Sequence, residues 1–195
     1  MTQRPGNVRD ELLSAAIELL RTDGAAGATA RAICNQVGVG PPALYHHYGS
    51  LDRLHHAAVD VAFEKVVACY SSAEQAGGPL HSIRNSWHML MQFARENPQM
   101  YGLINQQIIQ GKMPPLAQNA FDQMVADLAL LAQQQPLRHN PATAAKMLWA
   151  GGLGAATFIA SAALGGEMGL SISDQVNLSL GDVMLEALLD SLLEA

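Results

Sequence analysis

The chain has 195 residues, enough for one ordinary core or for a small domain beside a larger one, because domains usually run to about 100–150 residues. Hydrophobic residues make up 49% of the sequence and aromatic residues only 5%, a balance that favours helices over a β-sandwich. The formal net charge of −6 argues at first against nucleic acid as a partner, since DNA binding uses Lys and Arg to neutralise phosphates.

The excess of negative charge lies outside the first quarter of the chain. Residues 1–55 hold five basic and five acidic side chains, so residues 56–195 hold six basic and twelve acidic ones. This asymmetry permits a DNA-facing domain over residues 1–55 on an acidic body over residues 56–195. A neutral DNA-facing domain predicts modest non-specific affinity that depends strongly on salt.

Helical periodicity and capping residues predict four helices in the first part of the chain. The first runs from about Val8 to Thr22 and ends at Asp23-Gly24, where glycine supplies a left-handed residue. Thr29 caps a second helix that runs through Val37, and a third begins at Pro41 or Pro42 and ends near Tyr48. Ser50 caps a fourth helix that extends to about Ser72.

A Gly- and Pro-containing break at residues 75–79 separates these helices from five further helical patterns. They cover residues 80–96, 98–110, 115–134, 141–164 and 173–193. No stretch alternates as a strand does, so the sequence predicts an all-α fold of about nine helices. Residues 147–164 carry no charge but are rich in Gly and Ala, which indicates a closely packed helix rather than a membrane span.

Residues 29–48 contain the pattern of a helix-turn-helix. Ile33, Val37, Val39 and Leu44 are spaced to form a small core between two short helices, the second of which would lie in the major groove. The capped start at Thr29, the Gly38-Val39 turn and the run Leu44-Tyr45-His46-His47-Tyr48 occur together, and residues 10–54 resemble the DNA-binding region of TetR-family regulators. The resemblance implies an N-terminal three-helix DNA-binding domain followed by a larger helical domain for effector binding and dimerisation.

The same resemblance implies roles for individual residues. Arg31 stands where the family often reads a base, and Arg can donate two hydrogen bonds to guanine. Many relatives have Lys directly after the Ser that opens the fourth helix, and this chain has Leu51 there, so Arg53 is the candidate substitute. The full candidate DNA-binding set is Thr29, Arg31, Pro41, Pro42, Ala43, Tyr45, His46, His47 and Arg53.

Several of these residues have a purely structural alternative. Tyr45 and Tyr48 could both be core aromatics, with Tyr48 the stronger candidate for that role. The adjacent pairs His46-His47 and His55-His56 do not suit a metal ion, because neighbouring residues of a helix point about 100° apart. We therefore expect neither a metal nor a cofactor. Cys34 and Cys69 fit a reducing cytoplasm, where we expect both to be buried packing residues.

Methionines and aromatic residues cluster in the acidic body, which suits either an ordinary helical core or an adaptable pocket for an apolar ligand. The family resemblance favours the pocket, since these regulators usually sense a small molecule there. The candidate ligand-binding residues are Trp87, His88, Met89, Phe93, Met100, Tyr101, Met124, Met147 and Trp149.

The last two helical patterns indicate an interface between two copies of the chain. Gly151, Gly152, Ala155 and Ala156 permit close backbone approach, and the final helix has apolar residues on two faces. A two-fold dimer would present two recognition helices to a palindromic operator.

The sequence thus predicts a cytoplasmic, homodimeric, ligand-responsive regulator of transcription, most simply a repressor released from its operator by a small apolar effector. An activator or a regulator that needs a corepressor is the nearest alternative. A helical small-molecule carrier or an enzyme is a more distant one. No nucleophile with a nearby base and no phosphate-binding loop is evident, so we expect no catalysis.

Overall fold

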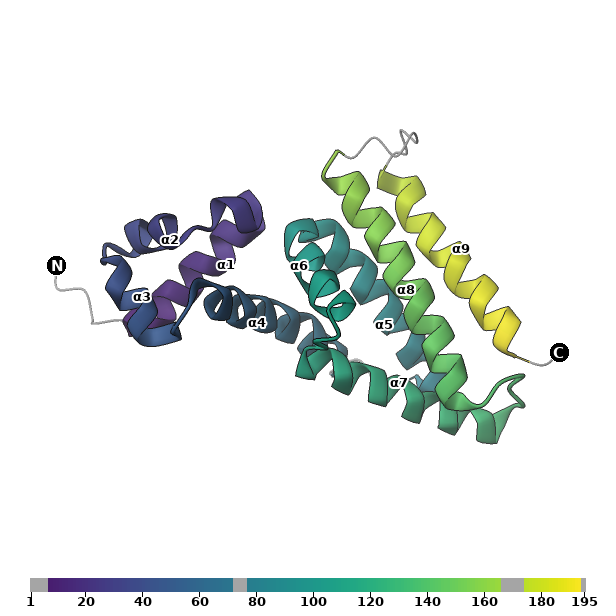
Figure 1. Ribbon diagram of the computed structural model, residues 1–195. Helices are drawn as coiled ribbons and strands as arrows, with labels where there is room; N and C mark the ends of the chain where they lie inside the picture. Colours follow the sequence, from purple (N-terminus) through teal and green to yellow (C-terminus); the bar gives the residue numbers. More distant parts are fainter. Residues whose placement is uncertain (1–6, 72–76, 166–173, 194–195) are drawn as a thin grey trace. The chain divides into compact units, whose positions relative to one another are not determined.

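The computed structural model describes residues 7–71, 77–165 and 174–193, apart from the side chains of residues 65–71, 116 and 174–179. These residues form nine α-helices and no strand, which confirms the all-α prediction for the part of the chain described (Figure 1). The chain divides into two compact units, Met1–Phe63 and Glu64–Ala195, and each is described by itself. The domain boundary expected at residue 55 stays a prediction.

The first unit contains α1 (Val8–Gly27), α2 (Ala30–Val37), α3 (Pro41–Tyr48) and the beginning of α4 (Leu51–Ser71). Helices α1, α2 and α3 all contact one another. Their shared core holds fully buried apolar side chains from each helix: Leu12, Ala16, Leu20, Ile33 and Leu44. Removing these side chains from water stabilises the unit by about 1.5–3 kcal/mol for each large one.

The end of α1 differs from the prediction. Gly24 does adopt a left-handed backbone, with φ 65° and ψ −171°, but helical turns resume after it and continue to Gly27. Gly24 therefore kinks the helix instead of ending it at Thr22. The kink costs little at this position because glycine has no Cβ atom to clash in that conformation.

The second unit contains α5 (Gly78–Glu96), α6 (Pro98–Ile109), α7 (Pro115–Gln134), α8 (Pro141–Ala163) and α9 (Asp174–Leu192). Proline occupies the first turn of α5, α6, α7 and α8, where its missing N–H costs no hydrogen bond. Helix α8 packs against α5, α6, α7 and α9, so it is the central helix of this unit (Figure 1). None of the described helices combines the length and hydropathy needed to cross a membrane.

Gly151 and Gly152 of α8 pack inside the chain, whereas the sequence interpretation assigned them to an interface between subunits. A Cβ atom at Gly151 would lie 2.5 Å from Cδ1 of Leu188 on α9. A Cβ atom at Gly152 would lie 3.4 Å from both Leu90 and Trp87 on α5. Gly151 and Gly152 therefore allow α8 to approach α9 and α5 of its own chain.

The connection between α7 and α8 is bonded to the end of α9. The main-chain N–H of Arg138 donates to the carbonyl oxygen of Leu192 over 2.9 Å, and Nε of Arg138 donates to that of Leu193 over 3.0 Å. The last carbonyls of a helix have no partner within the helix, so Arg138 satisfies two of them.

Candidate nucleic-acid interface

Helices α2 and α3 form the helix-turn-helix that the sequence predicts, and local hydrogen bonds fix its geometry. The hydroxyl of Thr29 accepts from the main-chain N–H of Ala32 over 3.2 Å, which caps α2. Gly38 ends α2 with φ 77°, and both its N–H and that of Val39 donate to the carbonyl of Cys34 over 3.0 Å. This αL cap turns the chain sharply before α3 begins.

Helix α3 has one buried side and one exposed side. Leu44 is fully buried and holds the helix against α1 and α2. Pro41, Pro42 and Tyr45 are exposed, and Tyr45 has 52% of its surface accessible. Tyr45 is therefore not a core aromatic, and its contact with DNA stays a prediction.

The remaining candidate residues of α3 are Ala43, His46 and His47, and they differ in exposure. His46 is exposed, whereas Ala43 and His47 are partly buried. The rings of His46 and His47 meet edge to face with centroids 5.1 Å apart. A phosphate or a base edge could be contacted by the imidazole N–H groups of either histidine.

Tyr48 has a structural role within this unit. Its hydroxyl donates to the main-chain carbonyl of Arg9 over 2.7 Å, and the Arg9 guanidinium lies 5.5 Å from the ring centroid. Burial raises the pKa of the Tyr48 hydroxyl above its usual value, and the nearby Arg9 charge opposes that shift. Tyr48 therefore ties the end of α3 to the beginning of α1.

Two of the predicted basic contacts are available at the surface. Arg31 on α2 and Arg53 on α4 are both exposed. Arg53 lies beside the residue that follows α3, since a Cβ atom at Gly49 would be 3.2 Å from Nη1 of Arg53. Leu51, the residue that replaces the expected Lys, is partly buried. Arg53 thus lies on the same helix, two residues after the position where the lysine is missing.

The other histidines of this region are held by contacts within the first unit. Nε2 of His55 lies 2.8 Å from the carbonyl oxygen of Ala28, and Nε2 of His56 lies 3.7 Å from Oδ1 of Asp52. Among the residues whose side chains are described, no group of three or more His, Cys, Asp or Glu side chains could hold a metal ion.

Cys34 is buried between the two helices of the motif, as predicted, and burial raises the pKa of its thiol. The side chain of Cys69 lies outside the described residues.

The candidate ligand-binding residues fall on four helices of the second unit. Trp87, His88, Met89 and Phe93 lie on α5, Met100 and Tyr101 on α6, Met124 on α7, and Met147 and Trp149 on α8. Four of them are buried: Trp87, Phe93, Met100 and Tyr101. Met89, Met124, Met147 and Trp149 are partly buried.

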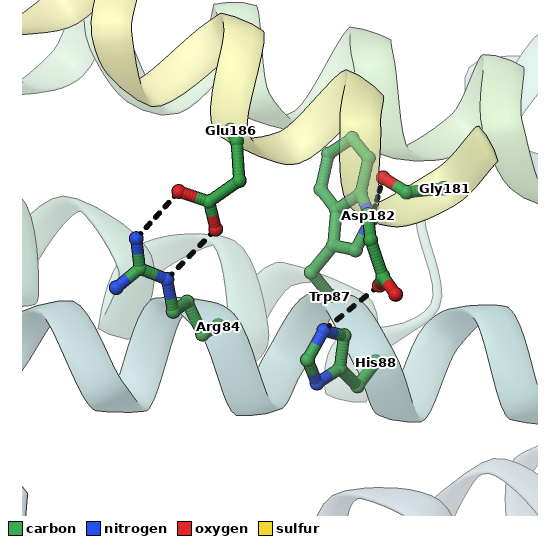
Figure 2. A network of polar contacts seen from close by, with 6 residues as sticks. All are labelled: Arg84, Trp87, His88, Gly181, Asp182 and Glu186. Carbon is green, nitrogen blue, oxygen red and sulfur yellow. Dashed lines mark hydrogen bonds and ion pairs between the residues drawn. The ribbon is translucent and has the colours of Figure 1, made fainter. Parts of the chain in front are cut away.

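Trp87 and Tyr101 are fixed by hydrogen bonds to main-chain carbonyls. The indole N–H of Trp87 donates to the carbonyl of Gly181 on α9 over 3.0 Å (Figure 2). The hydroxyl of Tyr101 donates to the carbonyl of Leu153 on α8 over 2.8 Å and lies 3.0 Å from the Thr157 hydroxyl. Burial raises the pKa of Tyr101, and the bond with Thr157 opposes that effect. The sequence pattern marked neither Gly181 nor Thr157, because each partner is distant in the chain.

His88 is not grouped with the buried candidates. It is exposed, and its Nε2 lies 3.1 Å from Oδ1 of Asp182 on α9. Figure 2 shows this pair beside the two-pronged ion pair between Arg84 and Glu186, whose shortest distance is 2.6 Å. A role for His88 in binding a ligand stays a prediction.

Trp149 makes a different contact from Trp87. Its ring meets that of Phe121 on α7 edge to face, with centroids 5.6 Å apart. The two tryptophans therefore report on different helix contacts of the second unit, one toward α9 and one toward α7.

A buried polar cluster that the sequence analysis did not identify joins α5 to α7. The carboxylate of Asp127 accepts from the Ser82 hydroxyl over 2.6 Å and from the Gln123 amide over 3.1 Å. Both Ser82 and Asp127 are buried, so these bonds offset the cost of removing the carboxylate from water.

Comparison with known proteins locates the family signal in the first unit. Residues 12–58 match the profile of the family described as bacterial regulatory proteins, tetR family. Among curated proteins, the chain is 26% identical over 121 residues to the nucleoid occlusion factor SlmA of Marinobacter nauticus, covering 62% of each chain. It is 32% identical over 99 residues to SlmA of Aliivibrio fischeri, covering 50% of each. The chain therefore spans 50–62% of the length of these relatives.

Solved structures match nearly the whole chain. The TetR regulator SCO7222 from Streptomyces coelicolor superposes with a TM-score of 0.70 at 22% identity, covering 94% of this chain and 98% of that one. FadR from Bacillus subtilis, solved in complex with stearoyl-CoA, superposes with a TM-score of 0.71 at 11% identity, covering 93% and 98%. At such identities the likeness establishes the fold. The helix-turn-helix region therefore belongs to the tetR family of bacterial regulatory proteins, and the chain has the fold of a transcriptional regulator of that family.

Proposed function

We propose that this protein is a homodimeric repressor that binds a palindromic operator through α3 and leaves it when a small apolar effector binds the second unit. The observation that carries the DNA-binding part is the exposed side of α3, formed by Pro41, Pro42 and Tyr45, on a helix held from behind by buried Leu44. Apolar Pro and Ala groups suit thymine methyls, and Arg31 suits a guanine edge. The protein would meet its operator in the cytoplasm.

The effector part rests on buried aromatic and methionine side chains on α5 and α6, with partly buried ones on α7 and α8. FadR, a protein of the same fold, has been solved with stearoyl-CoA, so acyl thioesters belong among the first compounds to test. An effector shifts the DNA-binding equilibrium only by its preference for one of the two conformations.

Selection of binding sites from random duplex DNA tests the central claim. We expect the full chain to enrich a palindrome with half-sites about one helical turn apart or a multiple of it. Enrichment of no sequence, or of a single half-site by a monomeric protein, would contradict the proposal. Deletion of the gene separates the modes of action, since transcripts next to bound sites rise for a repressor and fall for an activator. A compound that strengthens DNA binding would indicate a corepressor.

A second candidate function comes from the curated relatives, which are named nucleoid occlusion factors. A protein acting at the nucleoid could also bind DNA, so the selection experiment alone does not separate the two candidates. If deletion changes no transcript near any bound site, the repressor proposal is wrong and the role in the relatives' name becomes the better hypothesis.

A further inference from the structure

The first unit has few cations with which to bind DNA. Its described basic side chains are Arg9, Arg21, Arg31 and Arg53. Arg21 is already paired, because its Nη2 lies 2.7 Å from Oε1 of Glu18 and its Nε lies 3.2 Å from Oε2. Arg9, Arg31 and Arg53 form no ion pair with any described residue. Arg31 and Arg53 already belong to the candidate interface, which leaves Arg9 to be explained.

Arg9 is attached to the recognition helix although it belongs to α1. The Tyr48 hydroxyl donates to its main-chain carbonyl over 2.7 Å, and its guanidinium lies 5.5 Å from the centre of the Tyr48 ring. The side chain remains exposed. A guanidinium over an aromatic face is attracted by the ring electrons, and because it is planar and weakly hydrated it keeps its donors for a further partner.

The Arg9 guanidinium lies on the side of α3 that carries Tyr45, one of the candidate DNA-binding residues. Tyr45 precedes Tyr48 by three residues, so the two rings lie on one side of α3, and Tyr45 is exposed there. Arg53 lies beside Gly49, directly after Tyr48. The C-terminal end of α3 is therefore flanked by two guanidinium groups, one from α1 and one from α4.

We infer that Arg9 is a DNA phosphate-binding residue and that Tyr48 is the residue that positions it. Phosphate is the fitting ligand, because guanidinium forks bind its oxygens with two parallel hydrogen bonds. An arginine that contacts phosphate contributes affinity for all sequences and no discrimination among bases. The inference deepens the proposed function, since it depends on DNA binding through α3.

The salt dependence of DNA binding by the full chain tests this role. The probe is a fluorescent duplex that carries the selected palindrome, and the slope of log affinity against log salt counts released counterions. We expect Arg9→Ala to lower the magnitude of that slope by about 0.9 for each bound subunit, and to weaken binding equally for the palindrome and for a scrambled duplex. Arg21→Ala is the matched control, because it removes the same charge from a guanidinium that Glu18 already neutralises.

Tyr48→Phe tests the positioning role. The substitution keeps the ring but removes the bond to the Arg9 carbonyl, so we expect weaker DNA binding when Arg9 is present and no further weakening in the Arg9→Ala background. A merely structural role for Tyr48 would instead weaken binding equally in both backgrounds. Circular dichroism and urea unfolding confirm that each variant is folded.

The outcomes separate the inference from the proposed function. A parent protein that selects no sequence contradicts the repressor proposal itself. A parent that selects a palindrome, with Arg9→Ala matching either the parent or Arg21→Ala in its salt slope, overturns the assignment of Arg9 and leaves the proposed function standing. Equal effects of Tyr48→Phe in the two backgrounds overturn the positioning role.

Discussion

Trp87 on α5 donates its indole N–H to the main-chain carbonyl oxygen of Gly181 on α9, with 3.0 Å between the two atoms. The other edge of the ring lies beside α8, 3.4 Å from the place that a Cβ atom would take at Gly152. One side chain therefore connects three helices of the second unit. This arrangement makes Trp87 a structural anchor of the second unit.

The Trp87 anchor predicts a stability loss when its N–H is removed. Trp87→Phe keeps an aromatic ring but deletes the donor and part of the volume, so we expect the free energy of unfolding to fall by about 1–3 kcal/mol. Urea denaturation measures the change. Trp149→Phe is the matched control, because Trp149 is only partly buried, and we expect a smaller loss. Equal losses in the two variants would contradict the anchor.

Replacing Gly152 or Gly154 of α8 by Leu should have opposite effects on stability. Gly152→Leu inserts a side chain against Leu90 and Trp87, and such overpacking costs about 1–3 kcal/mol. Gly154→Leu meets no atom within 4 Å of its Cβ, so we expect the stability to be unchanged or raised by the better helix propensity of Leu. Urea denaturation compares the variants, and light scattering separates unfolding from dissociation. A stable Gly152→Leu protein would show that α5 and α8 have room to move.

The exposed residues of the helix-turn-helix predict two distinguishable DNA-binding defects. Arg31→Ala should lose about 1–3 kcal/mol of discrimination at one base pair, because Arg31 is the proposed base contact. Tyr45→Phe should weaken binding to all sequences alike, because its hydroxyl is a proposed phosphate contact. Fluorescence anisotropy with the palindrome and its single-base variants measures both. Arg31→Ala with unchanged discrimination would remove Arg31 from the interface.

The Arg84–Glu186 pair predicts a stability difference that depends on pH. The Arg84 hydrogen bonds lower the pKa of Glu186, so the pair stabilises the folded state above the unfolded value of about 4.3. This contribution disappears as the pH falls through the lower pKa of the folded state. The side chains of Arg84 and Glu186 are 37% and 52% exposed, so water screens the pair and we expect Glu186→Gln to cost only about 0.2–1 kcal/mol at neutral pH.

Urea denaturation of the parent and Glu186→Gln from neutral pH down to about pH 3 measures this difference. We expect the two proteins to converge at the acidic end. If the difference in unfolding free energy between the two proteins grows as the pH falls, the ion pair with Arg84 does not stabilise the folded state in the way proposed.

Helix boundaries were the part of the fold most accessible from sequence, because caps act locally. Thr29 bonds to a residue three positions away, and Pro41 begins α3 as a proline at a first helical position does. Contacts between distant residues had no such local signal. Tyr48 and Arg9 are 39 residues apart, and Trp87 and Gly181 are 94 apart.

Two interpretations of the second unit show why composition alone was ambiguous. Small residues permit close helix packing whether the neighbour belongs to the same chain or to another, and Gly152 proved to face α5 of its own chain. His88 was predicted to bind the ligand together with its neighbours Trp87 and Met89. Successive helix residues differ by about 100° in direction, and His88 lies at the surface beside Asp182 while Trp87 is buried.

The two hydrogen bonds from Arg138 affect local unfolding at the C-terminal end of α9. The final turn of a helix normally frays first, and its amide hydrogens then exchange quickly with solvent. Here the carbonyls of Leu192 and Leu193 are held by the α7–α8 connection, so fraying at this end requires that connection to detach as well. Slow hydrogen exchange in the last described turn of α9, lost in Arg138→Ala, would reveal a local opening unit made of two segments that meet only in the folded chain.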